Sequence, residues 1–84
     1  MKHTTNMISD IDLINTGDLE SLLERHLPIL KKLASDHIRK FPNTIFDDCL
    51  QNARVGAILA TQRFNIHSSV KFVTFLHKTV YFHL

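Results

Sequence analysis

The sequence predicts an all-α fold, a small helical bundle. The chain has 84 residues, of which 44% are hydrophobic, and it contains two Gly and two Pro. This composition is typical of a folded helical domain and not of a disordered chain. Apolar residues recur at helical spacing along most of the chain after residue 18. We therefore expect one domain over residues 18–84, preceded by a flexible N-terminal arm over 1–17, which is polar and lacks sustained periodicity.

The first predicted helix begins after Gly17, with Asp18 as its N-cap and "LESLLERHL" as its first turns. Pro28 is expected to interrupt or bend this helix, because proline lacks an N–H group and crowds the preceding turn. Beyond Pro28, apolar residues follow the spacing i, i+3, i+4, i+8 and i+11 up to Phe41, which places them on one helix face. Pro42 is expected to end the helix.

A second amphipathic helix is predicted from "NTIFDD" onward. Thr44 and Asp47 resemble a capping box at its start. Gly56 lies inside the helix, where glycine costs about 1 kcal/mol relative to alanine, so we expect a close approach by a neighbouring backbone. Three phenylalanines on apolar helix faces are predicted to be core residues: Phe41, Phe46 and Phe64.

The last stretch, "VKFVTFLHKTVYFHL" at residues 70–84, is ambiguous in isolation. Its first half alternates as a strand does and contains β-branched residues. A lone strand would have no pairing partner in an otherwise helical chain, so we predict a helix.

The charge is distributed asymmetrically along the chain. Residues 1–42 hold six basic and six acidic residues, whereas every charged residue after Asp48 is basic. Such a surface suits a polyanion.

No pattern in the sequence predicts an enzyme, a cofactor or a metal site. The six histidines show neither i, i+4 pairing nor a Cys-x-x-Cys companion. Cys49 is the single cysteine, without a companion base, so we interpret it as a packing residue. Ser35, Asp36 and His37 are consecutive on a helix and point in different directions, so they form no triad. No signal peptide or membrane span of roughly 18 apolar residues is evident, and we expect a cytoplasmic protein without a membrane partner.

The stretch "DDCLQNARVGAILATQRFNIHSSVKFVTFLHKTVYFHL", residues 47–84, resembles region 2 of the sigma-70 family, the promoter-recognition subunits of bacterial RNA polymerase. "HLPILKKLASDHI" resembles the preceding helix of that region, so the resemblance covers about residues 26–84. Phe75 takes the place of a family tyrosine. Residue types of the family pattern recur without a gap at nine positions: Asp48, Gln51, Val55, Gly56, Ala60, Phe64, Lys71, Phe72 and Thr74.

The resemblance implies two working surfaces on a helical bundle. The first docks on the clamp helices of the polymerase β′ subunit, and its candidate residues here are Asp48, Gln51, Asn52 and Arg54. Asn52 replaces a usual Glu and Arg54 a usual Asn, which alters the charge complementarity of that contact.

The second implied surface binds the non-template strand of the promoter −10 element. An aromatic ring replaces the lost stacking of an unpaired base, worth about 1–3 kcal/mol per base, and cations neutralise the backbone. Core packing explains Phe72 and Phe75 as well as DNA does, because residues three apart share a helix face; both interpretations stay open. The DNA-binding candidates are Lys71, Phe72, Thr74, Phe75 and Lys78.

Three departures from the family pattern shape the functional hypothesis. Lys78 and Thr79 replace the tryptophan pair that wedges the duplex open, and Phe82 replaces a glutamine that reads the duplex upstream. The sequence ends at Leu84, and the domains that read the −35 element are missing. We therefore expect one subunit of a split sigma factor, acting with a second subunit that carries region 4. Tyr81, Phe82 and Leu84 are the candidate contacts with that partner, unless this end frays.

Two other functions remain open. The missing tryptophans favour a decoy that occupies the sigma-binding site of the polymerase without opening promoters. The retained segment from Lys71 to Phe75 disfavours it. A helical protein-interaction module without a role at promoters is the third hypothesis.

Overall fold

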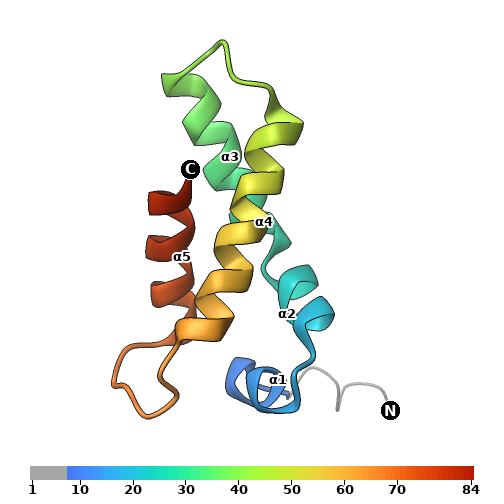
Figure 1. Ribbon diagram of the computed structural model, residues 1–84, viewed down its shortest axis with the longest axis vertical. Coiled ribbons are helices and arrows are strands. Elements are labelled where there is room, and N and C mark those ends of the chain that lie inside the picture. The colour runs from blue at the N-terminus through green and yellow to red at the C-terminus, as the bar shows by residue number, and fades with distance from the viewer. Residues whose placement is uncertain (1–7) are drawn as a thin grey trace.

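The computed structural model describes residues 8–84, and this part of the chain folds into helices with no strand (Figure 1). The predicted all-α class is confirmed, as is the helical interpretation of the last stretch. The elements are α1 (Asp10–Thr16), α2 (Leu19–Arg25), α3 (Leu27–Lys40), α4 (Phe46–Arg63) and α5 (Phe72–His83). None of the helices described is long and apolar enough to cross a membrane.

Helix α4 is the central element, and both α3 and α5 lie along it (Figure 1). Its buried face consists mainly of small residues: Ala53, Gly56, Ala57 and Ala60. Larger apolar side chains from the neighbouring helices fill the space over this face, among them Leu30, Leu33, Phe72, Leu76 and Val80. Because the α4 side chains are small, the backbones of its neighbours can approach closely.

Gly56 lies at a close approach of α4 and α5. A Cβ atom at this position would lie 3.0 Å from Cβ of His83 and 3.1 Å from Cα of Val80. The second of these is backbone, which cannot move aside without shifting α5. The predicted close approach of a neighbouring backbone at Gly56 is therefore confirmed.

Helix α1 lies in the segment predicted to be a flexible arm, and for residues 10–16 that prediction is wrong. Ser9 caps the helix by accepting a hydrogen bond from the backbone N–H of Asp12, and Gly17 ends it at φ 75°, a left-handed conformation that favours glycine. Leu13 is buried in the core. A helix this short shows too few apolar residues for periodicity to reveal it. Residues 1–7 of the predicted arm lie outside the described residues.

A polar contact attaches α1 to the junction of α2 and α3. One carboxylate oxygen of Asp10 lies 3.0 Å from Nη1 of Arg25 and 3.0 Å from Nε2 of His26. His26 is buried, and its ring lies 5.8 Å from that of Phe72. The N-terminal helix is thus anchored to the core by Leu13, by the half-buried Ile14 and by one carboxylate.

Three of the predicted helix boundaries are confirmed and one is wrong. Helix α3 ends at Lys40, with Phe41 as its C-cap directly before Pro42. Asp18 caps α2 by accepting a hydrogen bond from the N–H of Ser21, and Pro28 lies in the first turn of α3, where the chain restarts after His26. The capping box from Thr44 to Asp47 is absent, because Ile45 occupies the N-cap and no side chain caps α4.

The predicted core phenylalanines divide into two kinds. Phe64 is half-buried and contacts the rings of Phe72 and Phe75 at centroid distances of 5.3 and 5.6 Å. Phe46 is also half-buried. Phe41 is 55% exposed, so its assignment to the core is wrong. It follows the last residue of α3, where periodicity no longer determines which way a side chain faces.

Replacing Gly56 with valine is expected to destabilise the domain by about 1–3 kcal/mol, because the added atoms must displace the backbone of α5. Valine has a higher helix propensity than glycine, so a loss of stability at position 56 reports the crowding, and Gln51→Val places the same side chain on the exposed side of the helix as a control. Urea unfolding followed by circular dichroism measures both. Equal stability of the two variants would contradict the close approach.

Leu13→Ala is expected to cost about 2–3 kcal/mol, because it removes the buried side chain that attaches α1 to the core. Ile11→Ala makes a similar change on the exposed side of α1, where the side chain is 39% exposed. Amide hydrogen exchange across residues 10–16 distinguishes them. Exchange that is fast already in the wild type would contradict the attachment of α1 to the core.

Candidate interaction surfaces on α4, α5 and α3

Three of the four predicted polymerase-binding residues form a continuous row on α4. Asp48, Gln51 and Asn52 are exposed and lie at i, i+3 and i+4, so their side chains share one face. Val55, one turn further, is 44% exposed and extends the row with an apolar side chain. We call Asp48, Gln51, Asn52 and Val55 the α4 row. Sequence reasoning did not select Val55 as a site residue, although it lies at one of the positions that match the family pattern.

Arg54 is exposed but lies apart from the α4 row. It follows Asn52 by two positions, which places it on the opposite flank of the helix. There it lines a shallow hollow of about 260 Å³ with Glu20 and Glu24 of α2. Arg54 therefore shares this hollow with two acidic residues of its own domain.

A second exposed strip lies on α5. Lys71, Thr74 and Lys78 are exposed at i, i+3 and i+7, so two cations flank a hydroxyl on one face. Phe75 lies at the edge of this strip and is half-buried, with its ring against Phe64. We call Lys71, Thr74, Phe75 and Lys78 the α5 strip. Its charge is purely positive, which suits a nucleic-acid backbone.

Phe72 does not belong to the α5 strip. Only 4% of its surface is exposed, and its ring contacts both Phe64 and His26. A ring enclosed in this way cannot stack on a base without opening the domain. Of the two interpretations left open by the sequence, core packing is therefore confirmed for Phe72.

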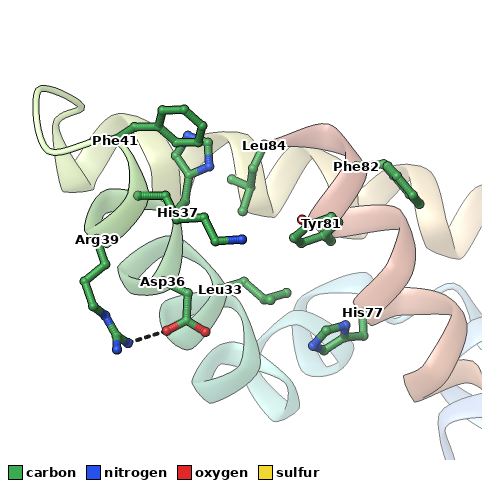
Figure 2. A pocket seen from close by; sticks show the side chains of 10 residues that line it. Leu33, Asp36, His37, Arg39, Phe41, His77, Tyr81, Phe82 and Leu84 are labelled. Atoms are coloured by element: carbon green, nitrogen blue, oxygen red, sulfur yellow. Dashed lines mark hydrogen bonds and ion pairs between the residues drawn. The ribbon is translucent and has the colours of Figure 1, made fainter.

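The predicted partner-binding residues line a groove between α3 and α5 with a volume of about 610 Å³. Tyr81 and Phe82 are 51% and 77% exposed, and Leu84 is half-buried. Figure 2 shows Tyr81 and Leu84 on the side of α5 that faces α3, with Phe41 over the ring of His37 on the other wall. Sequence reasoning missed the α3 wall, for which the aromatic residue directly before Pro42 was the available signal.

Charges at the groove are mostly positive. Asp36 accepts hydrogen bonds from Arg39 and Lys32, which neutralise it. The ammonium group of Lys40 lies 5.7 Å from the centroid of the Tyr81 ring, across the groove. A cation over an aromatic face is attracted by the ring quadrupole, so this contact orients both side chains.

The single cysteine and the potential metal ligands are the remaining candidates for reactive side chains. Cys49 is buried on α4. Within residues 8–84, no group of three His, Cys, Asp or Glu side chains is arranged to hold a metal ion.

Comparison with known proteins yields no match, whether with protein-family models, with curated proteins or with solved structures.

Truncating the two rings of the α5 N-terminal half is expected to have different consequences. Phe72→Ala should cost about 3–5 kcal/mol and unfold much of the protein, because its ring is enclosed. Phe75→Ala should cost only about 1–2 kcal/mol, since part of its ring is already in solvent. Thermal unfolding compares the two. A larger loss for Phe75→Ala would contradict the assignment of Phe72 to the core.

Proposed function

We propose that this protein is a transcription-initiation subunit of a split sigma factor. It binds the clamp helices of the polymerase β′ subunit and, with a separate partner that carries region 4, helps to recognise and melt the promoter −10 element in the cytoplasm. The proposal rests on the sequence resemblance of residues 26–84 to sigma region 2. One observation on the structure supports it: the polar residues that match the family pattern are exposed on the adjacent helices α4 and α5.

In this proposal the α4 row contacts polymerase. Its polar side chains lead to an exposed valine at one end, an arrangement suited to docking one helix on another, with Val55 desolvated and the polar residues setting the register. Arg54 contributes less than the sequence suggested, because it lies on the opposite flank of α4 from this row.

The α5 strip contacts the unpaired strand. Lys71 and Lys78 neutralise phosphates on either side of Thr74, and the exposed part of Phe75 stacks on a base. Phe75 remains the one aromatic candidate for stacking in this strip once Phe72 is assigned to the core.

The burial of Phe72 favours a second candidate function. A domain that retains the α4 row but has lost both the tryptophan pair and one of two stacking rings would occupy the polymerase without opening DNA. That protein would be an inhibitor that mimics sigma. The two functions share the polymerase contact and differ in the DNA contact.

A pull-down of the tagged protein from its native cell extract, followed by mass spectrometry, tests the proposal. Polymerase subunits together with a second small DNA-binding protein are expected for the split sigma factor. Polymerase alone would favour the inhibitor. If no polymerase is recovered, both functions are wrong and the protein is an interaction module of another kind.

Phe75→Leu is expected to reduce open-complex formation by about 10-fold, the cost of one lost stacking contact, while polymerase binding stays unchanged. Leucine preserves most of the packing against Phe64 but removes the ring. Phe64→Leu makes the same change in the same cluster outside the α5 strip and serves as the control. Permanganate footprinting of melted promoter DNA measures opening. Simultaneous loss of polymerase binding and opening would contradict the division of roles between α4 and α5.

A further inference from the structure

The aromatic rings of this chain are distributed unevenly between core and surface. Of the seven, three are more than half exposed: Phe41 at 55%, Tyr81 at 51% and Phe82 at 77%. All three line the groove between α3 and α5. Exposed apolar side chains gathered in one place mark an interaction site, and aromatic residues are the ones that most often dominate binding energy.

The walls of the groove determine how an occupant can be recognised. Both walls are helices, and no strand within residues 8–84 offers an unpaired backbone edge. An occupant must therefore be recognised by side chains and not by backbone pairing. The volume of about 610 Å³ and the ring of Tyr81 directed toward α3 (Figure 2) suit the apolar face of a helix laid between two others.

The charge of the walls determines which kind of helix fits. Asp36 is the only acidic residue on α3 and α5, and it is already paired with Lys32 and Arg39. Lys40 lies over Tyr81 and forms no salt bridge with any residue in the described range 8–84. Residues 1–7 contain no acidic residue. Of the five basic residues of the two helices, Arg39 and Lys40 line the groove.

We propose that this groove binds an acidic amphipathic helix of a partner protein. Its apolar residues, spaced i, i+3 or i+4, and i+7, pack against Tyr81, Phe82 and Phe41, and one of its carboxylates pairs with Lys40. A second copy of this chain is a poor occupant, because its α3 and α5 would bring further positive charge to a basic groove. Tyr81, Phe82 and Leu84 are the residues that the sequence analysis assigned to a second subunit, and the groove specifies the chemistry of such a partner. Failure of the split-sigma proposal leaves this inference unaffected, because no residue of the α4 row or the α5 strip lines the groove.

A displayed library of helix-forming peptides of about 20 residues tests the proposal. Selection is made on the full chain, with counter-selection on the double variant Tyr81→Ala, Lys40→Glu. Both positions are at the surface, so the variants are expected to fold as the wild type does. The selected sequences are expected to be acidic, with apolar residues at the stated helical spacing.

A synthetic peptide of the selected sequence is then measured by fluorescence anisotropy. Its affinity is expected to fall about 10-fold in Tyr81→Ala and again in Lys40→Glu, and to stay unchanged in Ile11→Ala, which alters an exposed apolar residue outside the groove. The proposal would be overturned if the library yields basic peptides or no peptide. It would also be overturned if the affinity is unchanged in Tyr81→Ala and in Lys40→Glu. Sedimentation velocity gives a further test. If the wild type is a dimer and Tyr81→Ala is a monomer, the occupant of the groove is a second copy and the proposal is wrong.

Discussion

The contact on which the rest of the structure depends is the close approach of α4 and α5 at Gly56. With no side chain at that position, Cα of Val80 lies within 3.1 Å of where a Cβ would be. The small residues Ala53, Ala57 and Ala60 continue the same face of α4, so α5 lies close along it. In a core this small, a few larger side chains, among them Leu30, Leu76 and Val80, fill the remaining space.

This packing decides which side chains are available for binding. Phe72, Leu76 and Val80 form the inner stripe of α5, which leaves Lys71, Thr74 and Lys78 on the outer side. On α4 the inner stripe of small residues leaves the α4 row exposed. The end of α5 extends beside the C-terminal half of α3, where no described element covers Phe41, Tyr81 and Phe82. A protein of this size therefore presents three chemically different surfaces, one polar with an apolar end, one cationic and one aromatic.

Much of this could be predicted from the sequence, because helical periodicity reports directly on burial. The inner stripe of α4, the break at Pro28 and the role of Gly56 all follow from local pattern. The short helix α1 could not be predicted, since its stability comes from Leu13 and Asp10 contacting residues distant in sequence. The sequence alone also could not assign Phe41 and Phe72 to the core or to the surface. Both lie on apolar faces in sequence, and only the tertiary arrangement places one in solvent and the other in the core.

The central functional claim is that the α4 row contacts the β′ subunit of RNA polymerase. A photo-activatable amino acid placed at Asn52, in the centre of the row, tests it most directly when the full-length protein is mixed with core polymerase. The account predicts a cross-link to the clamp helices of β′, and no such cross-link from the same probe at Arg63, an exposed position at the far end of α4. Absence of a cross-link from Asn52, or a cross-link to another subunit, would contradict the account.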